Sequence, residues 1–315
     1  MKNLKILVLE GGFNEEHDVS LSTGKEVKKS LSNLGIEFSS LIVNPKTFKK
    51  DINSFDKNYI CFNALHGSFG EDGSIQTILD KLAFKYTHSD SQTSYIGFNK
   101  DLTKKKLEKT SIVFPRYVSL NFQDLNEYKL KELLINMGEF IIKPNCSGSS
   151  FGIQIFKNQK DIDIFVRDFN NNSKIYENHK NILVEEFLKG RELTVSVIEK
   201  NGEALSIEVT EIISYNDNYF DYNSKYTPGA SKHILPAHLK NDLYNKCKKF
   251  AKIAHDKIKC RGVSRSDFIL VNEEIFFLEI NTQPGLTSVS LVPEQLEYQN
   301  ISFDNLILEI IKCST

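Results

Sequence analysis

Long apolar runs are missing from this sequence of 315 residues, in which no stretch approaches the ~18 residues of a transmembrane helix. The sequence also lacks an excess of one charge, with 40 Lys and Arg residues against 41 Asp and Glu residues. A chain with so balanced a charge has no general electrostatic attraction to nucleic acid or to an anionic membrane. Hydrophobic residues make up 40% and charged residues 26%, which excludes a wholly disordered chain.

Cysteine is scarce and scattered, with five residues that show neither metal-ligand spacing nor a disulfide framework. The amino-terminal segment has an apolar core of only residues 6–9, whereas a secretory signal needs about 7–15 apolar residues. We therefore expect a buried first strand and a cytoplasmic location.

Strand and helix signals alternate through roughly the first 100 residues, which predicts a parallel sheet with helices on its faces. Ligands bind beyond the carboxyl ends of such strands, where the glycine-containing loops 11–16 and 66–73 fall. The last ~135 residues carry longer strands and an irregular polar stretch at 215–236. The fold class is therefore α/β, in part α+β. The expected strands are 4–9, 36–43, 59–65, 116–120, 140–143, 152–156, 192–199, 203–213, 262–271 and 275–281, and the expected helices are 21–34, 74–84, 100–109, 125–137 and 239–257.

The carboxy-terminal hairpin carries a candidate metal site. Glu279 and Asn281 are two residues apart on one strand and so share a face, while Asp267 and Arg265 lie on the partner strand. Two carboxylates and an amide oxygen suit Mg²⁺, and charges in a half-buried strand are costly unless paired or metal-bound. The alternative is a surface hairpin with solvated charges.

Lys143 ends an apolar strand and precedes a loop of small residues, 145–150. An ammonium group followed by flexible backbone N–H groups can hold phosphate, although the pattern is not a Walker motif. The alternative is an ordinary hairpin loop with a lysine that reaches solvent.

Residues 182–192 form an apolar strand that ends in acidic residues and an apolar turn. Glu185, Leu188 and Glu192 could supply an acceptor, an apolar surface and a ribose ligand for adenosine, or could simply be charges at a strand end. Glu16 and His66 stand in the two glycine loops, where His66 has either a catalytic or a structural role. Ser20 or Ser22 is a candidate cap of the first helix.

Together these segments resemble the ATP-grasp superfamily, and within it the D-alanine–D-alanine ligase family. The resemblance spans the whole chain in the family's order, and seven segments carry it: 11–24, 64–76, 142–152, 185–195, 219–226, 262–268 and 278–293.

The resemblance implies a three-domain ATP-grasp fold: a Rossmann-like parallel-sheet domain at 1–98, a small central domain at 99–181 and a catalytic domain at 182–315. It implies synthesis of D-alanyl-D-alanine from two D-alanines and ATP through D-alanyl phosphate, for peptidoglycan precursors. It also implies two Mg²⁺ ions, with Mn²⁺ able to substitute, and a homodimer. Neither nucleic acid nor membrane insertion is implied.

The resemblance also implies individual roles. It places ATP on Lys100, Lys143, Ser150, Glu185, Leu188, Glu192 and Lys225, and the metals on Asp267, Glu279 and Asn281. It places the first substrate on Glu16 and His66, the carboxylate of the second on Ser290 and Leu291, and a link to a mobile loop on Ser149 and Tyr226.

For the chemistry, Arg265 and the backbone N–H of Gly285 are expected to stabilise the oxyanion that develops when the amine attacks. The polar stretch 215–236 is expected to shield the acyl phosphate from water. Tyr226 favours an amine nucleophile, since relatives that make the D-lactate ester tend to have phenylalanine there. Two alternatives remain: a ligase for another second substrate, such as D-lactate or D-serine, and a non-catalytic nucleotide-binding regulator. The intact set of Lys143, Arg265, Asp267, Glu279 and Asn281 argues against the regulator.

Overall fold

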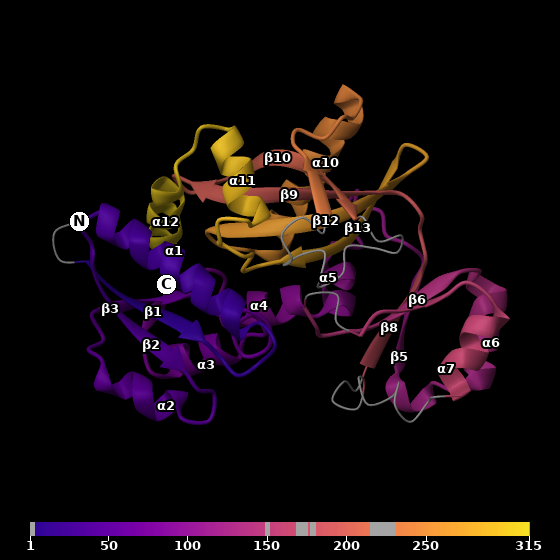
Figure 1. The fold of residues 1–315 in the computed structure, drawn as a ribbon, viewed down its shortest axis with the longest axis horizontal. Helices are drawn as coiled ribbons and strands as arrows, with labels where there is room; N and C mark the ends of the chain where they lie inside the picture. The colour runs from indigo at the N-terminus through magenta and orange to yellow at the C-terminus, as the bar shows by residue number, and fades with distance from the viewer. Residues whose placement is uncertain (1–3, 149–151, 168–175, 177–180, 215–230, 315) are drawn as a thin grey trace.

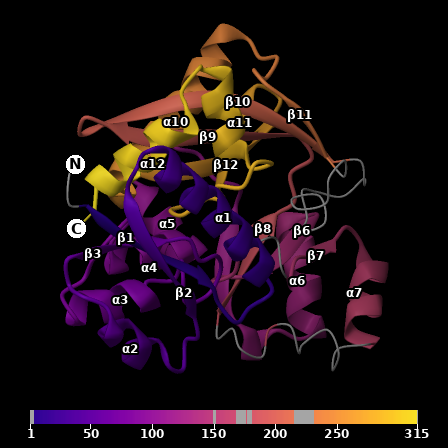
Figure 2. The same ribbon diagram turned by 60° about the vertical axis from the view of Figure 1, so that its left-hand side comes forward.

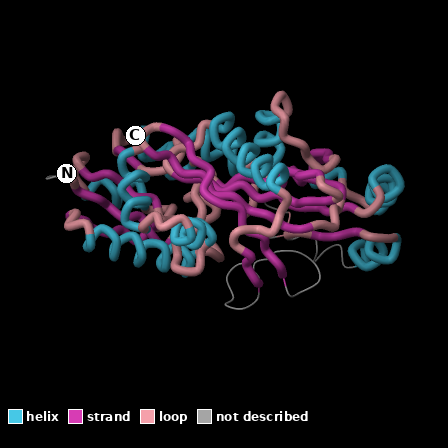
Figure 3. Tube along the Cα trace, turned by 90° about the horizontal axis from the view of Figure 1, so that it is seen from above, coloured by secondary structure: helices cyan, strands magenta, loops and turns pink. Residues whose placement is uncertain are grey.

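A computed structural model of the chain describes residues 4–148, 152–167, 176, 181–214 and 231–314. Its described strands form three sheets of four, four and five strands. In Figure 1 the amino-terminal sheet lies at one end of the molecule, the central sheet at the other, and the carboxy-terminal sheet spans the space between and above them. Figure 3, seen from above, shows both chain termini at the same end.

The first sheet is parallel, as the alternating pattern predicts, with strand order β2-β1-β3-β4. Along β1, Ile6 and Val8 pack on one face and Leu7 and Leu9 on the other, so both faces are buried. Its elements are β1 (Lys5–Gly11), α1 (His17–Asn33), β2 (Glu37–Val43), α2 (Phe48–Asp51), the short 3₁₀ turn η1 (Ile52–Ser54), β3 (Tyr59–Asn63), α3 (Ser74–Lys81) and β4 (Lys85–Tyr86).

Two short helices, α4 (Ser91–Phe98) and α5 (Lys100–Leu107), lead from the first sheet to the second. Asn99 separates them, and its side chain accepts a 2.9 Å hydrogen bond from the backbone N–H of Leu102, which caps α5. The cap fixes where α5 begins and therefore the direction of Lys100, its first residue.

The second sheet is antiparallel, with strand order β5-β8-β6-β7, and it packs against two helices (Figure 1). Its core includes Phe140 and Phe156, whose stacked rings lie 4.8 Å apart between centroids. The elements are β5 (Tyr117–Asn121), η2 (Phe122–Asp124), α6 (Glu127–Met137), β6 (Phe140–Pro144), β7 (Gln154–Phe156), α7 (Gln159–Arg167) and β8 (Asn181–Glu186).

The third sheet is antiparallel, with strand order β11-β10-β9-β12-β13, and α10 packs against it through Phe250, Ala251 and Ala254. Helix α12 packs against α1 in a core shared with the first sheet, which brings the carboxyl end of the chain back to its beginning (Figure 2). The elements are β9 (Arg191–Lys200), β10 (Glu203–Ser214), β11 (Ser231–Ile234), α10 (Asn241–Ile258), β12 (Val263–Val271), β13 (Glu274–Asn281), α11 (Leu291–Tyr298) and α12 (Phe303–Lys312).

Two sequence predictions are wrong. Residues 231–234 are not irregular, because β11 pairs with Glu211–Ser214 of β10; residues 215–230 lie outside the described part of the chain. Neither Ser20 nor Ser22 caps α1, because the helix begins at His17 and both residues lie inside it. The Ser20 hydroxyl instead accepts from the N–H of Gly11 and donates to the carbonyl of Ala64, 2.8 Å each. Ser20 therefore ties α1 to the ends of β1 and β3.

In the described residues no helix is both long and apolar enough to cross a membrane.

A buried histidine of α10 makes the stability of this fold sensitive to pH. Burial lowers the pKa of His255 from 6.5 to about 4, and its Nδ1 lies 2.8 Å from the hydroxyl of Ser264. Between pH 6.5 and 4 the unfolded chain binds a proton that the folded chain excludes, so the free energy of unfolding falls as pH falls. We expect this histidine to remove about 2 kcal/mol between pH 6.5 and 5. Urea unfolding at both pH values should show a smaller loss for His255→Gln than for the wild type, and equal losses would contradict the assignment.

Candidate active site

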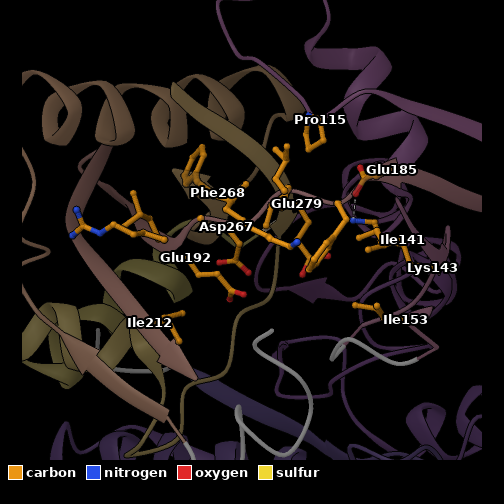
Figure 4. Close-up of a pocket in the computed structure, with 18 of the residues that line it drawn as sticks. Pro115, Ile141, Lys143, Ile153, Glu185, Glu192, Ile212, Asp267, Phe268 and Glu279 are labelled. Atoms are coloured by element: carbon orange, nitrogen blue, oxygen red, sulfur yellow. Dashed lines mark ion pairs between the residues drawn. The ribbon is translucent and has the colours of Figure 1, made fainter. Parts of the chain in front are cut away.

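A cavity of 490 Å³ lies between the second and third sheets (Figure 4). Both sheets contribute apolar side chains to its wall, which gives a flat ring an apolar surface on two sides. These residues are Ile141, Ile153, Ile155, Ile212, Phe268 and Leu278. Charged groups line the same cavity, and in Figure 4 the carboxylates of Asp267 and Glu192 point into it. A cavity of this kind suits a ligand with an apolar ring and a polar tail.

The carboxy-terminal hairpin brings the predicted metal ligands together. Asp267 lies directly opposite Glu279, and Arg265 lies opposite Asn281. The register then shifts between Asp267 and Phe268, which face Glu279 and Phe277, so β13 carries one extra residue, Leu278, beside the site. Such a bulge re-aims neighbouring side chains, and bulges are common next to active sites.

Hydrogen bonds orient two of these donors. Both carboxylate oxygens of Asp267 accept from the Arg265 guanidinium, at 2.9 and 2.8 Å, and Oδ1 also accepts from the Thr194 hydroxyl at 2.6 Å. The amide oxygen of Asn281 accepts from the backbone N–H of Gln283 at 2.7 Å. Three hard oxygen donors held in this way fit Mg²⁺. Among the described residues no group of three or more His, Cys, Asp or Glu side chains could hold a metal, so a Mg²⁺ ion at these donors would need further ligands such as water or phosphate oxygens.

Lys100 joins this hairpin to the small-residue loop that follows Lys143. Its ammonium lies 3.3 Å from a carboxylate oxygen of Glu279 and donates a 2.6 Å hydrogen bond to the carbonyl of Ser147. The loop is also tied to α5, since Asn145 accepts from the backbone N–H of Asp101 at 2.9 Å. A cation between an acidic hairpin and a small-residue loop is well placed for a phosphate chain.

Lys143 and Glu185 form an ion pair at one end of the cavity, marked by a dashed line in Figure 4. Lys104 binds the other oxygen of the same carboxylate at 2.7 Å. Burial acts to raise the pKa of Glu185, but the charges of Lys104 and Lys143 outweigh it and lower that pKa. Leu188 and Glu192, from the turn before β9 and from β9 itself, line the same cavity.

A second, smaller cavity of 90 Å³ adjoins the first and shares Lys100, Ser147 and Glu279 with it. All the residues predicted to bind amino acids or an oxyanion line it. These residues are Glu16, His66, Arg265, Gly285, Ser290 and Leu291. The shared residues place the acidic hairpin where the two cavities meet.

Glu16 and His66 are buried at the carboxyl edge of the first sheet. A Cβ atom on Gly67 would lie 2.5 Å from a carboxylate oxygen of Glu16, and one on Gly148 would lie 3.5 Å from it. The Glu16 carboxylate therefore reaches both the loop after β3 and the loop after β6. His66 contacts the Thr23 hydroxyl at 2.9 Å through Nε2 and the Glu71 carboxylate at 3.4 Å through Nδ1. Burial raises the pKa of Glu71. His66 is therefore fixed on both ring nitrogens.

Ser290 occupies the N-cap position of α11, without a capping hydrogen bond from its side chain, and lines the second cavity. Its hydroxyl accepts a 3.1 Å hydrogen bond from the N–H of Thr287, and a Cβ on Gly285 would lie 2.9 Å from that hydroxyl. The first N–H groups of a helix favour an anion, which suits a substrate carboxylate here.

Comparison with known proteins settles the family. The model described as "D-ala D-ala ligase C-terminus" matches residues 107–312. A D-alanine–D-alanine ligase of Pelagibacter ubique (strain HTCC1062) is 39% identical over 316 aligned positions, which cover 98% of this chain and 97% of that protein. The chain belongs to the D-alanine–D-alanine ligase family.

Solved structures of the D-alanine–D-alanine ligase family share the α/β ATP-grasp fold seen here. A crystal structure of the Bacillus anthracis enzyme complexed with ATP is similar with a TM-score of 0.79 at 24% identity, covering 98% of this chain and 97% of that one. The VanG D-Ala:D-Ser ligase of Enterococcus faecalis is similar with a TM-score of 0.79 at 25% identity, covering 99% of both chains.

Four residues predicted from the family resemblance, Ser149, Ser150, Lys225 and Tyr226, lie outside the described residues. All other predicted D-alanine–D-alanine ligase site residues line one of the two cavities. Lys104 was not identified from the sequence. Thr23 and Glu71, the two partners of His66, were not identified from it either. The one available signal for Lys104 was its place one helical turn after Lys100, on the same face of the expected helix.

Proposed function

We propose that this chain is an ATP-dependent carboxylate–amine ligase that joins two D-alanines and releases ADP and phosphate, for peptidoglycan precursors. One observation carries the proposal: the cavity lined by the predicted nucleotide ligands and the cavity lined by the predicted amino-acid ligands meet at Lys100 and Glu279. Phosphoryl transfer from a nucleotide to a carboxylate requires such a junction, because both reactants must lie within bonding distance.

We assign the larger cavity to ATP. Glu185 would accept from the adenine amino group, Leu188 would cover the ring and Glu192 would bind the ribose. Lys100 and Lys143 would bind phosphate oxygens together with Ser150 and Lys225. The isoleucines of the wall support this assignment, because they would give the adenine ring an apolar surface.

Asp267, Glu279 and Asn281 would hold two Mg²⁺ ions against the phosphates, and Mn²⁺ could replace them. When bound, the metal neutralises charge on the transferring phosphoryl group. The bidentate pair with Arg265 holds Asp267 in place for this task.

We assign the smaller cavity to the two D-alanines. Glu16 would pair with the ammonium of the first substrate, and His66 would lie near its carboxylate. The N–H groups at Ser290 and Leu291 would bind the carboxylate of the second substrate. Ser149 and Tyr226 would connect the loop after Lys143 with the polar stretch 215–236, which we expect to shield the site from water.

The reaction then has two steps. The first D-alanine carboxylate attacks the γ-phosphorus, which breaks the bond to ADP and gives D-alanyl phosphate. The amine of the second D-alanine attacks the acyl carbon, and the tetrahedral intermediate loses phosphate and a proton from nitrogen to form the peptide bond. The Arg265 guanidinium and the N–H of Gly285 would stabilise the oxyanion of that intermediate.

The organisation of the chain belongs to the same proposal. We place domain boundaries at 98/99 and 181/182, because each resulting part contains one sheet or most of one. A homodimer and a cytoplasmic location follow from the family resemblance, and sedimentation of the purified protein tests the former. The thiols of all five cysteines are free, which fits a reducing compartment.

The test is an assay of purified protein with ATP, Mg²⁺ and D-alanine, in which phosphate and dipeptide should appear in equal amounts. A panel with D-serine and D-lactate tests the alternative second substrates, to which the likeness to a D-Ala:D-Ser ligase draws attention. Preference for either over D-alanine as second substrate would overturn the D-alanine assignment. Binding of ATP without turnover would support the regulator instead.

Tyr226 gives a further prediction about the second substrate, although it lies outside the described residues. Tyr226→Phe should raise the yield of D-alanyl-D-lactate relative to dipeptide, about tenfold if one hydrogen bond is lost. Competition between D-alanine and D-lactate with product analysis by mass spectrometry measures the ratio. An unchanged ratio would remove Tyr226 as the selector.

A further inference from the structure

A lysine with no exposed surface lies behind the larger cavity. Of the lysines that the structure describes, only Lys104 is 0% exposed. It lies one turn after Lys100 on α5, and it is absent from the wall of the cavity. A buried ammonium is costly unless it is paired, so its partner shows what it is for.

The partner is Glu185, which is itself 0% exposed. The Lys104 ammonium lies 2.7 Å from one carboxylate oxygen, and Lys143 pairs with the other. The rings of Phe114 and Tyr117 stand 4.9 and 5.1 Å from the same ammonium, as cation–π contacts. Lys104 is therefore held on three sides.

The two lysines differ in what else they can reach. Lys143 lines the cavity and belongs to the proposed phosphate ligands, whereas Lys104 does not reach the cavity. When Lys143 turns to a phosphate, Lys104 remains as the cationic partner of Glu185. Burial lowers the pKa of Lys104 and the charge of Glu185 opposes that shift, while the charges of Lys104 and Lys143 outweigh burial at Glu185, whose pKa is lowered.

We propose that Lys104 is a positioning residue that holds the Glu185 carboxylate as a fixed acceptor and so selects a 6-aminopurine nucleotide over a 6-oxopurine nucleotide. The proposal rests on the assignment of Glu185 to the adenine amino group in the proposed function. It adds a residue that never touches the nucleotide but decides which base is accepted.

The selection follows from hydrogen-bond polarity. A charged carboxylate only accepts hydrogen bonds, the amino group of adenine donates, and the 6-oxo group of hypoxanthine accepts. ATP therefore gains a charge-assisted hydrogen bond, whereas ITP places an oxygen against the carboxylate. Without Lys104, the only ion-pair partner described for Glu185 is Lys143, for which phosphate competes. The Glu185 carboxylate is then no longer held in one place.

The test compares Lys104→Met with wild-type protein, using ATP and ITP as the probes. Calorimetry without D-alanine gives the dissociation constants for ATP and ITP. Kinetics with saturating D-alanine gives the KM values for ATP and ITP, and kinetics with saturating ATP gives the KM for D-alanine. We expect the preference for ATP over ITP to fall about tenfold or more, with the KM for D-alanine within about twofold of wild type. The matched control is Lys105→Met, because Lys105 is exposed and pairs only with nearby Asp101 among the described ion pairs; its ratio should not change.

Two further variants keep the test decisive. Lys143→Met should weaken ATP and ITP equally, since phosphate is common to both. Lys104→Met combined with Glu185→Gln removes both buried charges. This double variant can still be measured if Lys104→Met alone leaves a buried, uncompensated charge and does not fold. The double variant should have the same ATP-to-ITP ratio as Glu185→Gln alone.

The inference would be overturned if Lys104→Met showed the same preference for binding ATP over ITP as wild type. It would also be overturned if this preference were lower in the double variant than in Glu185→Gln alone. Either result would leave the proposed function intact if the wild type still forms dipeptide. Conversely, wild-type protein that binds ATP in preference to ITP but forms no dipeptide would refute the proposed function, and the binding ratios would still test Lys104.

Discussion

Replacing Glu279 by glutamine should lower kcat for dipeptide formation about a hundredfold or more. The change keeps the shape of the side chain but removes the negative charge opposite Asp267, 3.3 Å from the Lys100 ammonium. Loss of a metal ligand at a transferring phosphoryl group costs several kcal/mol, and each 1.36 kcal/mol is tenfold in rate. Steady-state kinetics at several Mg²⁺ concentrations measures the effect.

The expected signature for Glu279→Gln is a low rate that rises with added Mg²⁺, together with an unchanged melting temperature. Glu274→Gln is the matched control, because Glu274 begins the same strand and is exposed. It should have wild-type activity. Activity of Glu279→Gln within about threefold of wild type at low Mg²⁺ would contradict the metal assignment.

Replacing Arg265 by methionine should lower kcat about a thousandfold. Arg265 has two tasks: it donates to both oxygens of Asp267, at 2.9 and 2.8 Å, and it faces the amino-acid cavity. Loss of one oxyanion donor costs about 10²–10³ in kcat, and Asp267 also loses the group that orients it.

Arg265→Lys separates these two tasks. A lysine keeps the charge but cannot form the bidentate pair, so we expect an intermediate loss of roughly tenfold to a hundredfold. Arg261→Met is the control, because Arg261 lies on the approach to the same strand and pairs with Asp90 at 2.9 Å, away from both cavities. Equal rates for Arg265→Met and Arg261→Met would remove Arg265 from the chemistry.

The parts of the site that depend on local geometry could be predicted from the sequence. Glu279 and Asn281 share a face because strand residues alternate, and the hairpin turn places Asp267 on the neighbouring strand. The exact pairing of Asp267 with Glu279 depends on the bulge in β13, which the sequence analysis did not predict. The parallel first sheet follows from alternating strands and helices in the same way. In each case the decisive contacts lie within one supersecondary unit.

The parts of the fold and the site that depend on packing between distant elements could not be predicted from the sequence. Lys104 meets Glu185 only because the fold brings these side chains of α5 and β8 within 2.7 Å, and the sequence separates the two residues by 81 positions. Strand β11 forms because β10 offers it an edge, although its own sequence, with Lys232 and His233, reads as polar loop. The carboxy-terminal helix α12, absent from the predicted elements, returns to pack against α1.

The most direct test of the acyl-phosphate account follows oxygen. D-Alanine labelled with ¹⁸O in its carboxylate should transfer one labelled oxygen to each phosphate released, because that oxygen attacks phosphorus and leaves with it. Mass spectrometry of the phosphate should therefore find one ¹⁸O per dipeptide formed. Unlabelled phosphate, or phosphate released without D-alanine, would contradict the claim that the two cavities join a nucleotide to an amino-acid carboxylate.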